Sequence, residues 1–171
     1  MPRNEADTRA QLIDPALHQR GWAEEHIRRE QTPGAIDIID GQPQQFRGGR
    51  IDYVLRFQVN MTAQPLAMAI IEAKSEDRPP DHGLQQAKAY ADCMRMHVPF
   101  VFSSNGHQFV EFDATSQITS NAKPMADFPT PAELRQRYEA HVGFSLDDQA
   151  ARPLLTPYSG GEATRRYYQD A

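Results

Sequence analysis

Two acidic residues and one lysine stand at the ends of two apolar segments that have the pattern of β-strands. Asp52 lies near the start of "RIDYVLRFQV", residues 50–59, and Glu72 and Lys74 end "LAMAIIEAK", residues 66–74. Side chains alternate between the two faces of a strand, so Glu72 and Lys74 point to the same face. The turn-like sequence "NMTAQP" between the segments predicts an antiparallel hairpin, which brings the start of one strand beside the end of the other. We therefore expect the three charged side chains to converge.

Two carboxylates and an amine at one position have the composition of a metal-dependent phosphodiesterase site. Mg²⁺ takes oxygen ligands, binds through one or two carboxylates and keeps several waters. Such a cation generates the attacking hydroxide and neutralises charge on the phosphate, and a neighbouring lysine can position the water and stabilise the transition state. The spacing Glu-x-Lys also occurs by chance, and Asp52 could be an ordinary acid at a strand end. Because an unpaired charge is costly to bury, either a metal or an ion pair would explain the three residues.

Gln86 and Tyr90 are four positions apart in "LQQAKAYADCMRM", residues 84–96, whose apolar residues have helical spacing. They lie on one face of this predicted helix and could flank the charged residues. The alternative is that Tyr90 belongs to the core and Gln86 to its rim. Glu5 lies near the start of the first predicted helix. An acid there has an ordinary explanation, because the helix dipole stabilises negative charge at a helix N-terminus.

Three arginines flank the segments that carry these residues: Arg28, Arg47 and Arg50. Guanidinium groups beside such a site can grip DNA phosphates, although exposed arginines most often serve only as solvated surface. The net charge of −5 at pH 7 is not typical of a stand-alone, high-affinity DNA-binding protein. It is compatible with an enzyme that a larger assembly brings to DNA.

The remaining pattern predicts a mixed central β-sheet flanked by helices, an α/β (α+β) fold. Asn4 is the expected N-cap of a first helix, which Pro15 should interrupt and Gly21 should end. The strand, helix, strand order of residues 66–103 predicts a parallel crossover, and the sheet is expected to have four or five strands. The further strands are expected at "HIRRE", "VPFVFSS" and "HQFVEFD", and residues 32–49 are expected to form turns around the short apolar piece "AIDII".

After Asp113 the sequence changes in character, becoming polar and rich in proline. "AELRQRYEAHV" predicts a short helix, and "LLTPYSGGEATRRYYQDA" has the composition of a linker. We expect one sheet domain over residues 1–125, and a C-terminal helix and linker over residues 126–171.

The composition argues against several other classes of protein. No apolar run approaches the roughly 20 residues of a membrane span, and the N-terminus "MPRNEADTRA" is too polar for a signal peptide. Cys93 is the single cysteine, so an internal disulfide is impossible, which fits a reducing cytoplasm. No cysteine or histidine pairs have zinc spacing, which argues against a structural zinc. These features predict a cytoplasmic globular domain.

Several segments together resemble one family of proteins. The opening "NEADTRAQLIDPALHQRGW", the segments "RIDYVL" and "PLAMAIIEAKSED", and then "GLQQAKAYAD" and "VPFVFSSNGHQFVEFD" are similar to the N-terminal nuclease domain of the R subunit of type I restriction enzymes. Those domains belong to the PD-(D/E)xK nuclease superfamily, so the resemblance implies a restriction-endonuclease-like core. It covers most of the chain, and the joint pattern is far more specific than Glu-x-Lys.

The resemblance implies a role for each candidate residue. Asp52 and Glu72 would be the metal-binding acids, with Mg²⁺ as the cofactor, and Lys74 would be the catalytic lysine. The family's first motif carries proline before the aspartate, and this sequence departs from it with an isoleucine, a change that is common in the superfamily. The auxiliary residues match a Gln-x-x-x-Tyr element beside the active site and an acidic position of the first helix: Gln86, Tyr90 and Glu5.

The resemblance also implies a larger assembly. "FPTPAELRQRY" and "LLTPYSGGEATRRYYQDA" are similar to the segment that leads into the family's ATP-dependent DNA-translocating motor, yet the sequence has no Gly-x-x-x-x-Gly-Lys-Ser/Thr loop. We therefore expect a fragment of a longer subunit, with ATP used only by the motor. The expected partners are double-stranded DNA, that motor, and methyltransferase and specificity subunits, with no membrane involved.

The expected activity is that of a type I site-specific deoxyribonuclease, whose Mg²⁺-dependent endonuclease domain cuts when the complex stalls during translocation. Two alternatives stay open. One is a non-catalytic DNA-guiding or docking module of the same assembly, for which divalent-cation binding would be absent or indifferent to Asp52→Ala. The other is a self-sufficient PD-(D/E)xK nuclease, which would cut DNA without ATP or partner subunits.

Overall fold

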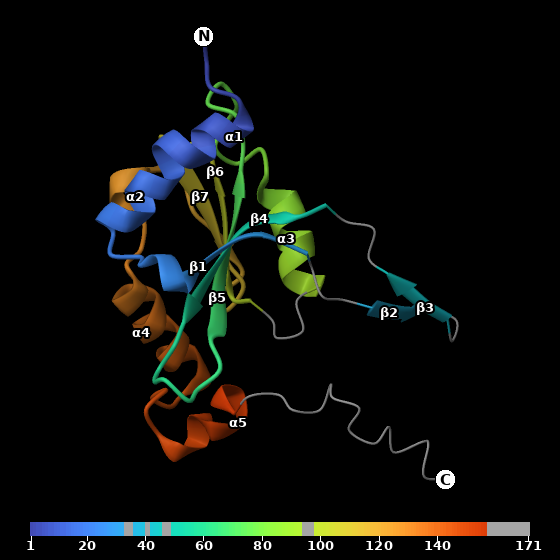
Figure 1. The fold of residues 1–171 in the computed structure, drawn as a ribbon, viewed down its shortest axis with the longest axis vertical. Helices are drawn as coiled ribbons and strands as arrows, with labels where there is room; N and C mark the ends of the chain where they lie inside the picture. The colour runs from blue at the N-terminus through green and yellow to red at the C-terminus, as the bar shows by residue number, and fades with distance from the viewer. Residues whose placement is uncertain (33–35, 40–41, 46–48, 94–97, 157–171) are drawn as a thin grey trace.

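The computed structural model describes residues 1–32, 36–39, 42–45, 49–93 and 98–156. Its centre is a seven-stranded mixed sheet with the order β1-β4-β5-β6-β7-β8, in which β9 also pairs with β7 (Figure 1). A separate antiparallel pair consists of β2 (Ile36–Ile39) and β3 (Gln42–Gln45). The strands of the large sheet are β1 (Ile27–Gln31), β4 (Ile51–Phe57), β5 (Leu66–Ala73), β6 (Phe100–Ser104), β7 (Gln108–Asp113), β8 (Ile118–Thr119) and β9 (Lys123–Pro124).

The strand pairing confirms the expected fold class and corrects the expected strand number. β4 and β5 form the predicted antiparallel hairpin, and β5 pairs with β6 in parallel. The sheet has seven strands rather than four or five. The segment "HIRRE" adds to the edge of the sheet beside β4, whereas β8 and β9 have two residues each, too few to show a period of two in the sequence.

The N-terminal helical segment consists of α1 (Glu5–Thr8), the π-helical turn η1 (Arg9–Ile13) and α2 (Asp14–Gln19). Asn4 is its N-cap, because the Asn4 side chain accepts the N–H of Asp7 at 2.8 Å. Pro15 lies at the start of α2, but the helical backbone runs without a break from η1 into α2, so its missing N–H falls inside a continuous helical segment. The predicted interruption therefore takes the form of a wide π turn just before the proline. Gly21 follows α2 with φ +88°, a left-handed conformation that suits glycine.

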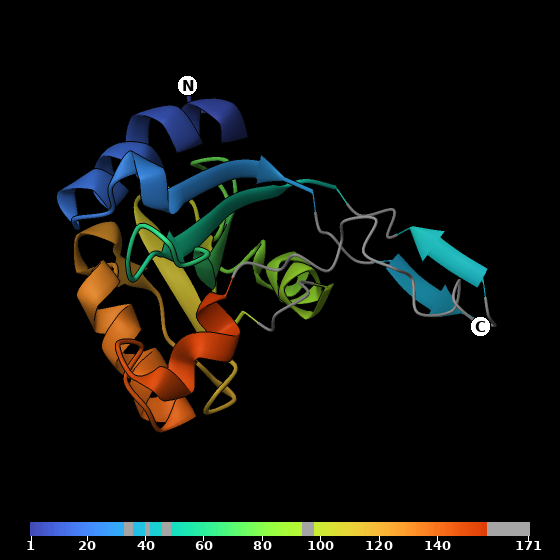
Figure 2. The ribbon, with the colours of Figure 1, turned by 60° about the horizontal axis from the view of Figure 1, so that its bottom comes forward.

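Helices cover both faces of the sheet (Figures 1 and 2). The helix α3 (Leu84–Cys93) lies on one face, while α1, α2 and α4 (Pro131–Val142) lie on the other. Short helical turns connect these elements: η2 (Glu24–His26), η3 (Met125–Asp127), η4 (Gln149–Ala151) and α5 (Arg152–Leu155). In the part of the chain described here, no helix is both long and apolar enough to cross a membrane.

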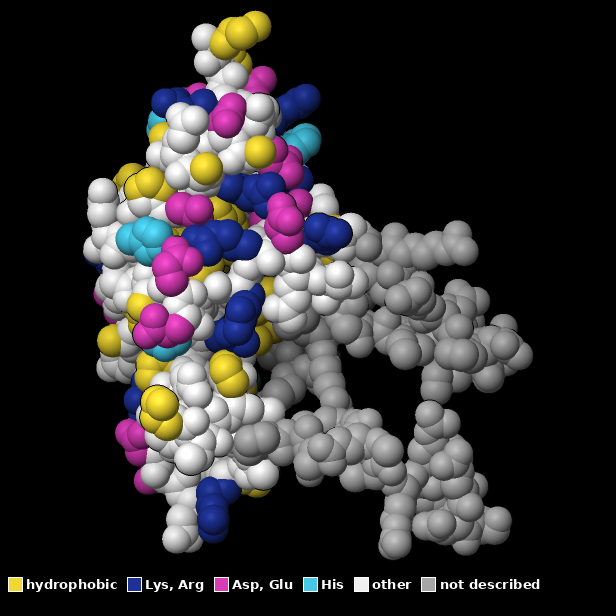
Figure 3. All heavy atoms as spheres, in the orientation of Figure 1, with side chains coloured by type: hydrophobic (Ala, Val, Ile, Leu, Met, Phe, Trp, Pro, Cys, Tyr) yellow, Lys and Arg dark blue, Asp and Glu magenta, His cyan; other side chains and the backbone are white. Residues whose placement is uncertain are grey.

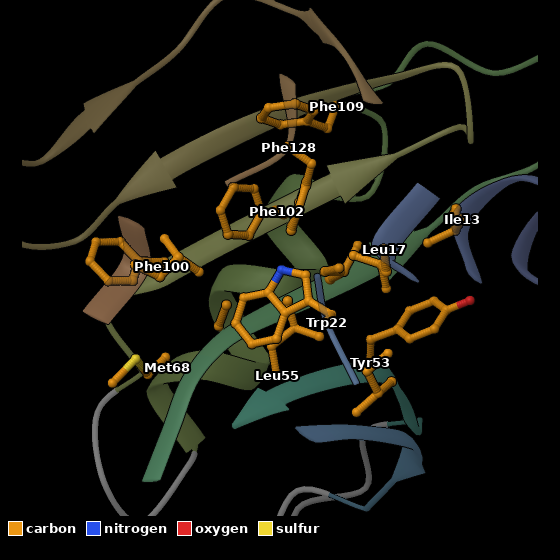
Figure 4. Packing of buried hydrophobic residues seen from close by; sticks show 14 of the residues in the cluster. Ile13, Leu17, Trp22, Tyr53, Leu55, Met68, Phe100, Phe102, Phe109 and Phe128 are labelled. Atoms are coloured by element: carbon orange, nitrogen blue, oxygen red, sulfur yellow. The ribbon is translucent and has the colours of Figure 1, made fainter. Parts of the chain in front are cut away.

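The larger core cluster lies between the sheet and the N-terminal helices and α4, as Figure 4 shows. Phe102, Phe109 and Phe128 pack ring against ring, with centroid distances of 4.7 to 5.8 Å. Trp22 is fully buried, and its Nε1–H donates to the carbonyl of Pro129 at 2.9 Å. This one cluster also includes side chains from the C-terminal part of the described chain: Leu134, Tyr138, Leu146 and Ala151. The division at residue 125 stays a prediction, and residues up to 151 share the core of the sheet.

The strand β5 is buried on both faces, as its continuous apolar sequence predicts. Ile71 and Ala73 belong to the larger cluster, whereas Ile70 belongs to a second cluster beneath α3. Because side chains alternate along a strand, Glu72 lies on the same side as Ile70 and faces α3.

Candidate active site

The hairpin brings the first acid of one strand beside the last acid of the other. The register pairs Tyr53 with Ile71, so Asp52 and Glu72 are the next residues along the two strands. Both acids are buried, with exposed fractions of 7% for Asp52 and 2% for Glu72. The structure therefore places two carboxylates side by side inside the protein, at the point where the sequence predicts a site.

The carboxylate of Asp52 accepts one hydrogen bond on each oxygen. Its Oδ2 accepts the N–H of Ala73 at 2.8 Å, and its Oδ1 accepts from Nη1 of Arg9 at 3.0 Å. Burial raises the pKa of Asp52 above its ordinary value, and the hydrogen bond from Ala73 and the charge of Arg9 only partly oppose this effect. A second positive charge at this carboxylate would thus be favourable.

Glu72 has one oxygen with a partner and one without. Its Oε1 accepts from Nζ of Lys74 at 2.8 Å, whereas Oε2 is buried and has no hydrogen-bond partner among the described residues. Burial raises the pKa of Glu72 to about 7, with the charges of Asp52 and Glu5 acting in the same direction and the hydrogen bond from Lys74 acting against it. A buried acceptor without a donor is costly, so Oε2 indicates a missing partner.

Lys74 links the acids to the helix α3. Its Nζ donates to Glu72 and, at 3.2 Å, to Oε1 of Gln86, and it lies 4.0 Å from Oε2 of Glu5. Burial alone would lower the pKa of Lys74, but the hydrogen bond and charge of Glu72 outweigh burial and raise it. Lys74 therefore carries its positive charge at neutral pH.

Gln86 and Tyr90 extend this arrangement along α3. Gln86 Nε2 and the hydroxyl of Tyr90 are 2.9 Å apart, so the contacts run from Glu72 through Lys74 and Gln86 to Tyr90. Tyr90 is also buried in the core cluster beneath α3. The two alternatives for Tyr90 therefore hold together, since its ring is part of the core and its hydroxyl belongs to the polar chain.

The structure places the three candidate arginines differently. Arg50, just before β4, donates to Oε2 of Glu30 at 3.4 Å, beside the arginine that contacts Asp52. Arg28 is exposed on β1, opposite Val54 and so two residues along β4 from Asp52. Arg47 lies outside the described residues.

Two residues of the site were missed by the sequence reasoning. Gly83 lies just before α3 and packs against the side chains of Glu72 and Lys74. A Cβ at this position would lie 2.7 Å from Cγ of Glu72 and 2.8 Å from Cε of Lys74. The signal in the sequence for this close approach was that the residue immediately before the predicted helix is a glycine. Arg9 contacts Asp52 directly, and its only signal was its position four residues after Glu5 in the first helix.

The donor set fits a hard divalent cation. Asp52 and Glu72 supply adjacent carboxylates in a buried position, and Oε2 of Glu72 lacks a partner among the described residues. Within those residues, no group of three or more His, Cys, Asp or Glu side chains could hold a metal ion. Two carboxylates suffice for Mg²⁺, which commonly completes its shell with waters and phosphate oxygens.

Comparisons with known proteins identify homologues of the chain. No protein-family model matches it. The chain is 31% identical over 175 residues to the endonuclease subunit of the type I restriction enzyme EcoAI from Escherichia coli, covering 96% of this chain and 20% of that subunit. It also matches the structure of a fragment assigned as the HsdR subunit of a type I restriction enzyme from Vibrio vulnificus, with a TM-score of 0.64, 33% identity, and coverage of 84% of this chain and 27% of that one. The chain is thus homologous to one part of the endonuclease (HsdR) subunits of type I restriction enzymes.

Proposed function

We propose that this chain is the Mg²⁺-dependent endonuclease domain of a type I restriction enzyme R subunit, and that it hydrolyses phosphodiester bonds of double-stranded DNA. The observation that carries the proposal is the meeting of Asp52, Glu72 and Lys74 at one buried position, with an oxygen of Glu72 that has no partner among the described residues. The homology to type I endonuclease subunits supports the same activity.

Asp52 and Glu72 would hold the cation. Mg²⁺ bound there would neutralise charge on a DNA phosphate and lower the pKa of a water molecule. The two carboxylates are poorly suited to stand side by side without it, because burial raises the pKa of both and the charge of Asp52 raises the pKa of Glu72 further. Burial also keeps these ligands in place, since both acids come from paired strands in the middle of the sheet.

Lys74 would act on the reacting phosphate and water. Its ammonium group is charged at neutral pH, and hydrogen bonds to Glu72 and Gln86 fix its orientation. A fixed positive charge in a partly buried site stabilises negative charge that develops in the transition state. Gln86 in turn is held by the hydroxyl of Tyr90, so both would position Lys74 rather than touch the reacting atoms. Glu5, 4.0 Å from the ammonium, would add a further negative charge near it.

DNA binding would depend on the assembly around this domain. Acidic and basic side chains lie interspersed on the face drawn in Figure 3, and the net charge is −5. We therefore propose that Arg28, Arg47 and Arg50 add phosphate contacts to a duplex that other parts of the enzyme deliver. Those parts would be the subunit's own motor domain, which uses ATP, and methyltransferase and specificity subunits, all acting in the cytoplasm.

The test is cleavage by the assembled enzyme carrying Lys74→Ala. Replacing a group that stabilises the transition state should lower the cleavage rate by about 10²-fold or more, while ATP hydrolysis is retained. Lys88→Ala is a control, because Lys88 lies on α3, the helix that carries Gln86, but its Nζ stacks over Phe112, 3.7 Å from the ring centre. Full cleavage by Lys74→Ala would refute the catalytic assignment and favour the non-catalytic docking module. Cleavage by this chain without ATP or partner subunits would instead favour the self-sufficient nuclease.

A further inference from the structure

Arg9 occupies the side of Asp52 that faces the N-terminal helices. Its Nη1 donates to Oδ1 of Asp52 at 3.0 Å, and its Nη2 donates to Oε1 of Glu30 at 3.3 Å. One guanidinium therefore bridges a buried carboxylate on β4 and an exposed carboxylate on β1. Arg9 is also the first residue of the π-helical turn η1, a type of turn that is frequent at functional sites.

The placement of Glu30 is unusual for its residue type. Its backbone has φ +53°, a left-handed conformation that is uncommon for residues other than glycine. The register pairs Arg29 with Tyr53 and Gln31 with Ile51, so Glu30 lies opposite Asp52 on the neighbouring strand. A strained backbone persists where its surroundings fix it, and such positions cluster at functional sites. Glu30 is thus held opposite Asp52 and shares Arg9 with it.

We propose that Arg9 is the counter-ion of Asp52 in the metal-free protein, and that a divalent cation displaces it from Asp52 while Glu30 keeps it beside the site. This inference rests on the cation site of the proposed function. The displaced guanidinium has room and a partner, because a cavity of about 360 Å³ adjoins it and is lined by Glu30, with Asp14 there already paired with Arg29.

The charges of the site make this exchange favourable. Glu5, Glu30, Asp52 and Glu72 are four acidic groups, against which Arg9 and Lys74 supply two positive charges, so the site without a cation has an excess of negative charge. A dication offsets that excess, and Arg9 stays nearby as one of the positive groups that a DNA phosphate can approach. Arg9 would thus keep Asp52 paired until the cation arrives and would afterwards favour the phosphate.

Calorimetric titration of the full chain with Mn²⁺ tests the exchange. Arg9→Met removes the competing charge and should tighten Mn²⁺ binding by about tenfold, since a dication and a single charge repel over a few ångström even in water. Arg50→Met is the matched control: it removes a charge that also contacts Glu30 but not Asp52, and should change the affinity by less than about threefold. In nitrogen-15 NMR of the wild-type chain, Mg²⁺ should shift the Nε–H signal of Arg9, and Asp52→Asn should abolish that shift.

The outcomes separate this inference from the proposed function. Tighter Mn²⁺ binding by Arg9→Met than by Arg50→Met supports the exchange. Equal or weaker binding by Arg9→Met, with binding still lost in Asp52→Asn, overturns the exchange and leaves the nuclease proposal standing. Absence of Mn²⁺ binding in the wild type and in Arg9→Met, or binding indifferent to Asp52→Asn, overturns both.

Discussion

The raised pKa of Glu72 predicts that the protein without divalent cations loses stability as the pH rises, and that Glu72→Gln removes this loss. Burial raises the pKa of Glu72 from 4.5 to about 7. A raised pKa means that the folded protein binds this proton more tightly than the unfolded chain does. The stabilisation is therefore complete below pH 4.5 and is lost as the pH rises through 7.

The expected size of the effect follows from the difference between these two pKa values. At about 1.4 kcal/mol per pKa unit, the wild type should lose about 3 kcal/mol of unfolding free energy from this group between pH 5 and pH 8. Glu72→Gln keeps a neutral side chain at every pH, so the variant should be the more stable protein at pH 8 and close to the wild type at pH 5. For a chain of this length the difference corresponds to roughly 6–12 °C in melting temperature at pH 8.

Thermal and urea unfolding in EDTA, followed by circular dichroism at pH 5 and pH 8, measure this difference. Glu133→Gln is the control, because Glu133 caps α4 and its pKa is lowered, so that it titrates below this pH window. Adding Mn²⁺ at pH 8 should reverse the order, stabilising the wild type and not Glu72→Gln. Parallel stability profiles for the wild type and Glu72→Gln between pH 5 and pH 8 would refute the reasoning.

Two further predictions concern residues outside the three charged ones. Gly83→Ala places a methyl group within 3 Å of the side chains of Glu72 and Lys74, so it should cost about 1–3 kcal/mol and weaken Mn²⁺ binding, and unchanged affinity by calorimetry would contradict the close approach. Thr130→Ala removes the capping box at the start of α4, where Thr130 and Glu133 exchange hydrogen bonds, and should lower the unfolding free energy by about 1 kcal/mol. Thr130 has no hydrogen bond to Asp52, Glu72 or Lys74 among the described contacts, so Thr130→Ala should leave the Mn²⁺ affinity at the wild-type value. A changed Mn²⁺ affinity would show that the start of α4 and the cation site are coupled.

Much of the site could be predicted from the sequence because it depends on two strands adjacent in the chain. The apolar run before Glu72 and the alternating pattern after Asp52 show that both segments are strands and which side chains share a face of the sheet. The short turn between the two strands makes antiparallel pairing the simplest connection. The convergence of Asp52, Glu72 and Lys74 follows from these local features alone. Their catalytic roles stay predictions until the variants above are measured.

Arg9 and Glu30 could not be predicted in the same way. An arginine in a first helix and a glutamate on a polar strand are both ordinary surface residues by sequence. Their importance arises only because β1 adds to β4, a pairing between strands separated by residues 32–50, and because η1 lies above that edge. Contacts between distant segments leave no periodic signal in a single sequence.

The edge position of β1 has a consequence for self-association. Among the described strands, β1 has only β4 as a neighbour, and its outer row of backbone groups could template another chain. The left-handed residue Glu30 breaks the flat profile that an incoming strand requires, and Arg28 and Arg29 add exposed charge. The same geometry that holds a guanidinium near Asp52 therefore also discourages the sheet from growing between copies, so the protein should resist aggregation through this edge.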